Sequence, residues 1–172
     1  MYIETERLII RTYEEKDKED LAEYMLQRVH AKFEDYPDFT VEKAQEEIDY
    51  RCKSDEFYAI ELKCEQKVIG NIYLGKRQFQ SLEIGYVLNE NYMHEGYGSE
   101  AAKIAIQWAF SKGIHRIYAE CSPNNTASWK TMEKIGMKRE GLLRQNVSFH
   151  HDKNGNPIYW DTCVYGILPT DI

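Results

Sequence analysis

The chain has 172 residues, of which 42% are hydrophobic and 30% charged, a composition typical of a folded globular protein and long enough for a single domain over residues 1–172. Its formal net charge of −7 argues against general nucleic-acid binding, which needs a basic surface. The sequence contains neither an apolar signal segment at the N-terminus nor a stretch long enough to cross a membrane, so we expect a cytoplasmic protein.

The first half of the chain predicts one strand, two helices and three further strands. In chain order these elements cover residues 3–11, 14–26, 41–52, 57–62, 68–74 and 81–88. The first helix is amphipathic, and Thr40 is the expected N-cap of the second. A polar turn joins the strands at residues 57–62 and 68–74 into a hairpin. The connection over residues 30–39 contains Pro37 and is expected to be a loop.

The second half predicts two more helices and three more strands. A helix over residues 99–112 precedes a strand over 114–121, a short helix that ends near Gly136, and strands over 137–147 and 158–168. In the first of these helices, apolar side chains recur at helical spacing, at Ala101, Ile104, Ala105 and Trp108. The order of elements predicts a mixed α/β domain with a central βαβ unit.

The most informative segment is the glycine-containing loop that joins the strand at 81–88 to the helix at 99–112. Residues 91–101 read NYMHEGYGSEA. Glycines let the backbone approach a ligand closely. The first turn of the following helix offers unpaired N–H groups at the positive end of the helix dipole. This combination predicts a phosphate-binding site.

One interpretation of this loop is a dinucleotide site. Gly96, Gly98 and Ala101 satisfy the pattern G-x-G-x-x-G/A, and Glu120 lies about 20 residues on, where a ribose-binding acid belongs. The surrounding pattern argues against an NAD-binding oxidoreductase, because such domains contain several βαβ units and this chain predicts one.

Short motifs along nearly the whole chain support another interpretation. They are ETERLIIR at residues 4–11, VIGNI at 68–72, LEIGYVL at 82–88, GYGSEA at 96–101, PNNTAS at 123–128, EKIGM at 133–137, and WDT at 160–162 followed by Tyr165. In this order and spacing the chain resembles the Gcn5-related N-acetyltransferase (GNAT) family, within it the ribosomal-protein (RimJ/RimL-like) branch. The resemblance implies a twisted, mostly antiparallel sheet of six to seven strands with helices on both faces.

The resemblance also implies acetyl-CoA as cosubstrate. Its pantetheine arm would lie between the separated strands at 81–88 and 114–121, beside Tyr86, Val87 and Leu88, with Asn125 near the thioester end. The pyrophosphate would lie on the loop already predicted from its glycines, against Met93, His94, Glu95, Gly96, Tyr97, Gly98 and Ser99. The family usually has Gln or Arg at the first of these positions and often glycine at the second. This loop therefore keeps its backbone donors and lacks that side chain.

Two residues are candidate catalytic groups. Many members of the family carry a tyrosine as general acid at the position of Met132, which cannot donate a proton, so Ser128 is the candidate acid for the CoA thiolate. Glu83 is the candidate base, acting on the amine directly or through water. Ordinary alternatives are helix capping at residues 125–128 and an ion-paired Glu83. A backbone N–H near Val87 or Leu88 would meet the developing oxyanion.

The acceptor implied is a primary amine, on a small molecule or a protein N-terminus. The segments at residues 33–39 and 149–159 are expected to flank its cleft, with acids able to attract a cation at Asp35, Asp38, Asp152 and Asp161. We expect no metal, because no His/Cys/Asp/Glu cluster has ligand spacing, and reduced thiols at the four scattered cysteines. Homodimers are common in the family. A non-catalytic acyl-CoA-binding module is the remaining alternative, suggested by Met93, His94 and Met132.

Overall fold

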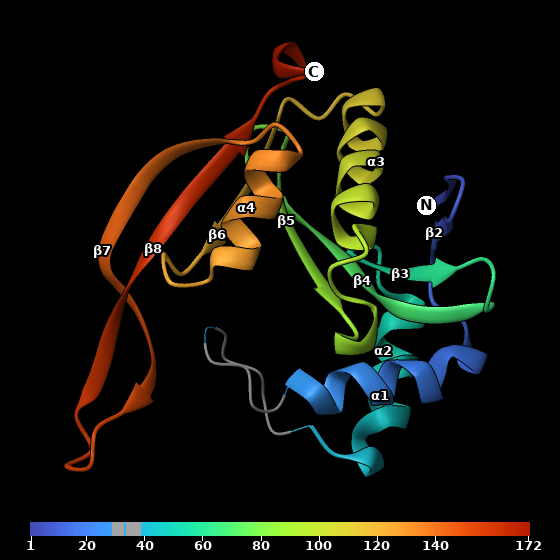
Figure 1. Ribbon diagram of the computed structural model, residues 1–172, viewed down its shortest axis with the longest axis horizontal. Coiled ribbons are helices and arrows are strands. Elements are labelled where there is room, and N and C mark those ends of the chain that lie inside the picture. The colour runs from blue at the N-terminus through green and yellow to red at the C-terminus, as the bar shows by residue number, and fades with distance from the viewer. Residues whose placement is uncertain (29–32, 34–38) are drawn as a thin grey trace.

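An eight-stranded sheet organises the chain in the computed structural model, which describes residues 1–28, 33 and 39–172 (Figure 1). The strand order is β1-β2-β3-β4-β5-β6-β8-β7. The strands are β1 (Tyr2–Glu4), β2 (Leu8–Arg11), β3 (Phe57–Leu62), β4 (Lys67–Arg77), β5 (Ser81–Leu88), β6 (Arg116–Cys121), β7 (Lys138–His151) and β8 (Pro157–Ile167). The β5–β6 pair is parallel and the other neighbouring pairs are antiparallel, which confirms the predicted mixed, mostly antiparallel sheet.

The sheet has one strand more than predicted, because residues 3–11 do not form one continuous strand. The Thr5 hydroxyl accepts a hydrogen bond from the Leu8 N–H at 2.8 Å, and the Thr5 N–H donates to the Leu8 carbonyl at 2.9 Å. Such a local turn satisfies backbone groups that a strand would have paired across the sheet. The chain therefore folds back, and β1 pairs antiparallel with β2.

Four α-helices cover both faces of the sheet, as predicted. Helices α1 (Lys18–Arg28) and α2 (Ala44–Lys53) lie on one face, and α3 (Tyr97–Ser111) and α4 (Thr126–Lys134) on the other (Figure 1). Short 3-10 turns precede α1 and α2, so both α-helices begin later than the sequence suggests. The expected N-cap Thr40 precedes the second of these turns without a side-chain capping bond. Within the described residues no helix is long and apolar enough to span a membrane.

Each face of the sheet has its own hydrophobic core. Strand alternation turns Ile84 toward the core under α3 and α4, and Val87 toward the core under α1 and α2. Ile60 and Ile72 are fully buried in the first core. Burying each such side chain stabilises the fold by about 1.5–3 kcal/mol. The two cores clamp β5 from both sides, which holds its backbone in place beside the candidate site.

A buried arginine fixes α1 and α2 onto the sheet. Arg51 is 3% exposed, and its guanidinium donates to the Tyr24 hydroxyl at 2.9 Å, to Asn71 Oδ1 at 3.0 Å and to Glu47 Oε1 at 2.7 Å. A buried charge is tolerated only when it is paired and hydrogen-bonded in this way. Asn71 pairs with Val87 in the β4–β5 ladder, so this hydrogen-bond network holds the end of β5 in place from the side of α1 and α2.

The two parallel strands separate soon after they start. They pair at Ser81–Arg116, Leu82–Ile117 and Glu83–Tyr118, whereas β5 continues to Leu88. Figure 1 shows β5 and β6 diverging beyond this point, with α3 and α4 above them. The strands and α3 form the predicted βαβ unit, and the described residues contain no β5–β6 pair beyond the third. One edge of β5 is therefore left without a strand partner.

Candidate active site between strands β5 and β6

The N-terminus of α3 has the backbone features of an anion-binding position. Gly96 is its N-cap, with φ at +83° and no side-chain capping bond. The Ser99 hydroxyl donates to the Gly96 carbonyl at 2.9 Å, so the hydroxyl is used within the loop. An α-helix leaves the N–H groups of its first turn without intrahelical acceptors, and those of Tyr97, Gly98 and Ser99 lie at the positive end of a 15-residue helix. The arrangement matches the phosphate site that the glycines predict.

His94 occupies a backbone conformation that explains why the family often has glycine there. Its φ is +69°, in the left-handed region that costs most side chains strain. Histidine is among the residues that adopt this region more readily than others. His94 therefore preserves the path of the loop, and it is exposed rather than directed into a catalytic position.

Gly98 lets α3 approach β5 closely. A Cβ at this position would lie 3.1 Å from Leu88 Cδ1. That separation is tighter than an ordinary carbon–carbon contact. The second glycine of the motif therefore places the first turn of α3 directly beside the free edge of β5.

Two cations that sequence reasoning missed converge on this loop. A Cβ at Gly96 would lie 3.7 Å from Arg7 Nη2 and 3.9 Å from Lys134 Nζ. Arg7 is held by an ion pair with Glu100 at 2.6 Å, and its guanidinium lies 4.4 Å from the centre of the Tyr97 ring. Arg7 belongs to the motif ETERLIIR and Lys134 to the motif EKIGM, two of the motifs that carry the family resemblance. Their presence in these motifs was the sequence signal that could have identified them as site residues. They supply positive charge that Met93 lacks.

The free edge of β5 presents defined backbone groups. The Asn89 N–H donates to the Ile69 carbonyl of β4 at 2.8 Å. Because N–H groups alternate in direction along an antiparallel strand, the Val87 N–H also faces β4. The N–H groups of Tyr86 and Leu88 face the other way, toward the side on which β6 has diverged. Of the two candidate oxyanion donors, Leu88 thus has the N–H on the open side.

The start of α4 lies across the gap from this edge. Asn125 Oδ1 accepts from the Ser128 N–H at 3.2 Å, so Asn125 acts as the N-cap. The Tyr86 hydroxyl donates to the Ser128 carbonyl at 3.0 Å and thereby ties β5 to α4. Met132 is 2% exposed and packs in the core. Ser128 is half-buried, and its side chain remains the candidate acid of this helix.

The Ser128 side chain lies beside the Cys121 thiol at the end of β6. Burial, with a smaller contribution from the neighbouring Cys163, raises the pKa of Cys121 to about 11, although Ser128 lowers it. Cys121 is therefore a protonated thiol at neutral pH. A thiol in this state is a poor nucleophile, which argues against a cysteine acyl-enzyme.

Two carboxylates lie on the sheet face opposite α3 and α4, in different situations. Glu83 forms an ion pair with Arg77, at the end where β5 and β6 still pair. Glu120 shares that face with Tyr118 by strand alternation. Within the described part of the chain, Glu120 makes no hydrogen bond or ion pair. Burial and the nearby charge of Glu83 raise the pKa of its carboxyl group. The structure thus shows the ion-paired alternative for Glu83, and a base role for it stays a prediction.

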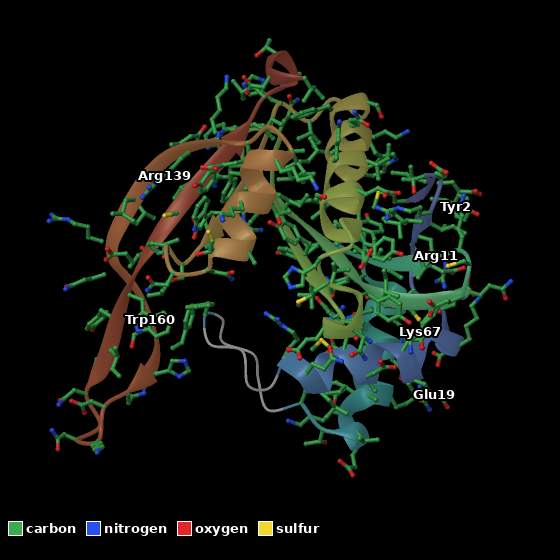
Figure 2. The ribbon with its side chains drawn as sticks, viewed as in Figure 1. Tyr2, Arg11, Glu19, Lys67, Arg139 and Trp160 are labelled. Carbon is green, nitrogen blue, oxygen red and sulfur yellow. The ribbon has the colours of Figure 1, made fainter. Side chains whose placement is uncertain are left out.

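A cavity of about 250 Å³ opens between β6 and the β7–β8 hairpin. It is lined mainly by aromatic, apolar and acidic residues: Phe33, Glu120, Cys121, Ser122, Val147, Phe149, Trp160, Asp161 and Thr162. Trp160, labelled in Figure 2, projects from β8, with the Phe33 ring 6.0 Å from its ring by centroid distance. The cavity lies where the acceptor cleft was expected.

The acids predicted to attract a cation separate into distinct groups. Asp161 lines the cavity. Asp152 caps the tip of the hairpin instead, accepting from the Asn154 N–H at 2.8 Å. Asp35 and Asp38 lie outside the described residues.

Comparison with known proteins gives a consistent picture. A family model described as "Acetyltransferase (GNAT) domain" matches residues 7–138. An uncharacterised N-acetyltransferase of Bacillus subtilis (strain 168), YnaD, is 37% identical over 98% of this chain and 97% of its own. The crystal structure of a GNAT-family acetyltransferase from Bacillus anthracis superposes with a TM-score of 0.87 at 35% identity, covering 98% of both chains. RimL, a ribosomal L7/L12 acetyltransferase solved with coenzyme A, shares the fold at a TM-score of 0.81, 19% identity and 98% coverage of both chains.

Proposed function

This chain belongs to the GNAT acetyltransferase family, and from that premise we propose that it transfers the acetyl group of acetyl-CoA to a primary amine, on a small molecule or a protein N-terminus, by direct attack in a ternary complex. The observation that carries the proposal is the separation of β5 from β6 beside the glycine-capped N-terminus of α3. This separation places three features next to one another: the proposed phosphate site, the edge of β5 that has no strand partner, and the start of α4.

The residues present fit acetyl-CoA. The first-turn N–H groups of α3 suit the pyrophosphate, and Arg7 and Lys134 flank them with positive charge. The outward N–H and carbonyl groups of Tyr86 and the outward carbonyl group of Leu88 suit the amides of the pantetheine arm, which can pair with β5 as a neighbouring strand would. Bound there, acetyl-CoA supplies an acetyl thioester with a thiolate leaving group.

Ser128 is positioned to handle the proton of the leaving group. Its backbone is fixed from two sides, by the Asn125 cap and by the Tyr86 hydroxyl. A free thiol has a pKa near ~8.5, so a thiolate needs only a modest proton donor. In the proposed mechanism the Ser128 hydroxyl protonates the departing sulfur, and the Leu88 N–H donates to the oxyanion.

The amine must lose a proton before it attacks. Glu83, the base suggested by the sequence, is engaged by the Arg77 guanidinium and is less available to accept that proton. The better proton acceptor is then water or Glu120, which lies on the same face and has no partner among the residues that the structure describes.

Thermal unfolding with acetyl-CoA, CoA and NAD tests the cosubstrate. A ligand at about 100 times its Kd adds roughly 2.7 kcal/mol, which raises the Tm of a chain this size by about 5–10 °C. We expect such a shift with acetyl-CoA and none with NAD. A shift with NAD alone would refute the proposal. Thiol release from acetyl-CoA that requires an added amine then separates a transferase from a non-catalytic acyl-CoA-binding module.

A further inference from the structure

On the basis of the proposed acetyl transfer, we propose that the acceptor is a small primary amine bearing an aromatic or similarly flat apolar group. It binds in the cavity between β6 and the β7–β8 hairpin, with its amine at Glu120. This goes beyond the amine class that the family implies, because it names the rest of the molecule.

The size and lining of the cavity point to a small apolar group. Its volume of about 250 Å³ is below the range of roughly 300–1,000 Å³ typical of sites for drug-sized ligands. Val147, Phe149 and Trp160 contribute apolar surface from the two strands of the hairpin. A single ring with a short alkylamine chain matches the volume of this space better than a long polyamine, whose extended chain would reach beyond it.

Trp160 is the centre of an aromatic group. The ring centroids of Phe33 and His150 lie 6.0 Å and 5.7 Å from that of Trp160, with interplanar angles of 63° and 59°. Tilted pairs at these separations are favourable for aromatic rings. A planar guest in the adjoining cavity would extend the same arrangement.

Glu120 is the group in this cavity that suits an ammonium ion. Its side chain is exposed to solvent, and its carboxyl group makes no hydrogen bond or ion pair with any residue that the structure describes. Partial desolvation and the nearby charge of Glu83 raise the pKa of this carboxyl group. Asp161 is different, because its Oδ1 accepts from the Gln145 N–H at 2.8 Å and thereby holds an irregular part of β7. Of these two acids, Glu120 is the one free to pair with a cation or to take a proton from it.

Consecutive residues of β6 connect this cavity to the cofactor side. Glu120 and Cys121 both line the cavity, and Cys121 lies beside the Ser128 side chain. Neighbouring strand residues point to opposite faces, so the Glu120 carboxyl group and Ser128 lie on opposite sides of the sheet, one residue apart along β6. Because β5 has already separated from β6 at this point, the gap between the two strands connects the cavity with the side on which the thioester is expected.

The transfer balances with these groups. The ammonium gives one proton to Glu120, and the freed nitrogen pair forms the C–N bond at the thioester carbonyl. The C–S bond breaks, its electron pair goes to sulfur, and Ser128 supplies the proton of the free thiol. The second proton lost by nitrogen restores Ser128, and Glu120 returns its proton to solvent.

The test compares acceptors on the purified full chain at saturating acetyl-CoA, with thiol release as the readout. The panel is 2-phenylethylamine, tyramine, hexylamine, spermidine and short peptides with free N-termini. We expect kcat/KM for the aromatic amines to exceed that for hexylamine by about tenfold or more, since one buried ring contact contributes about 1.5 kcal/mol. Preference for spermidine or the peptides, or equal use of hexylamine, would overturn the inference and leave acetyl transfer standing. No transfer to any amine, together with no thermal shift from acetyl-CoA, would refute the proposed function itself.

Variants test whether Trp160 and Glu120 determine the preference for aromatic amines. Trp160→Ala should lower kcat/KM for 2-phenylethylamine about tenfold and leave the KM for acetyl-CoA unchanged, while Trp160→Phe retains most activity. Tyr2→Ala is the matched control, since this aromatic residue is 64% exposed and lies on β1, at the opposite edge of the sheet. Glu120→Gln preserves shape and should lower kcat/KM for the aromatic amines by about 100-fold, in the range of general base catalysis. If Trp160→Ala and Tyr2→Ala behave alike, or if Glu120→Gln is fully active, the assignment is wrong.

Discussion

The two sides of the gap between β5 and β6 differ in the chemical groups that they present: one presents backbone groups and the other presents side chains. The proposed cofactor side consists of backbone groups of residues 86–99, nearly continuous in sequence, arranged by strand alternation and two positive φ angles. The proposed acceptor side consists of side chains from β6, β7 and β8 and from Phe33. Backbone N–H groups remain available when side chains change. Met93 and His94 illustrate this, because they replace the usual family residues while the loop keeps its backbone donors. Binding of the acetyl donor therefore depends on backbone geometry that the family shares, whereas the choice of acceptor depends on side chains that are particular to this chain.

The largest effect should follow from placing a negative charge in the phosphate site. Asp is tolerated at positive φ and is a good N-cap, so Gly96→Asp should fold. Its carboxylate would occupy the proposed pyrophosphate position, pair with Arg7 and Lys134, and repel the negatively charged pyrophosphate. We expect the Kd for acetyl-CoA, measured by calorimetry, to rise about 100-fold. Gly96→Asn has the same shape without the charge and should lose about tenfold; equal losses would remove the electrostatic explanation.

The next effect concerns the residue that links the two sides. Ser128→Ala should lower kcat about 30-fold and leave both KM values nearly unchanged, as expected for loss of a general acid. The Asn125 cap survives, because it uses the Ser128 N–H. Thr131→Ala removes another hydroxyl of α4, which bonds only the Ala127 carbonyl at 2.8 Å among the described residues, and serves as the control. If Cys121→Ala lowers kcat as much, the serine acts through the thiol and not on the leaving group.

A smaller effect tests whether side chains assist the backbone on the cofactor side. Lys134→Ala should raise the KM for acetyl-CoA about fivefold, since an exposed charge pair contributes about 1 kcal/mol or less. The loss should shrink in 0.5 M salt, where screening is short-ranged. Lys130→Ala on the same helix removes a lysine that lies over the Trp129 ring, 5.7 Å from its centre, and should leave this KM unchanged. Equal effects of the two variants would show a general surface charge.

The smallest effect should come from the tie between β5 and α4. Tyr86→Phe removes the hydrogen bond from the Tyr86 hydroxyl to the Ser128 carbonyl and keeps the aromatic ring. A single hydrogen bond contributes about 0.5–1.5 kcal/mol, so we expect a Tm lower by about 2–5 °C and a kcat about threefold lower. An unchanged kcat with the lower Tm would mean that Ser128 is positioned by its Asn125 cap alone.

Much of the fold could be predicted because the local signals are strong. The strands at residues 57–62 and 81–88 were found with the predicted bounds, since side-chain alternation and flanking turns mark both ends. The strand at residues 3–11 was the exception. The bonds of the Thr5 hydroxyl and N–H to Leu8 compete with strand pairing there, and a propensity pattern does not include them.

The candidate site divides in the same way. The sequence by itself determined the glycine-capped start of α3 and the place of Ser128 in the first turn of α4, because glycine conformations, helix ends and capping are local and depend on residues a few positions apart. Only the tertiary structure decided that Arg7 and Lys134 meet at Gly96, that Glu83 is paired with Arg77, and that Glu120 lines a cavity with aromatic residues and has no partner among the described residues. Those relations join strands and helices remote in sequence, and they follow from the packing of both faces of one sheet rather than from any local pattern.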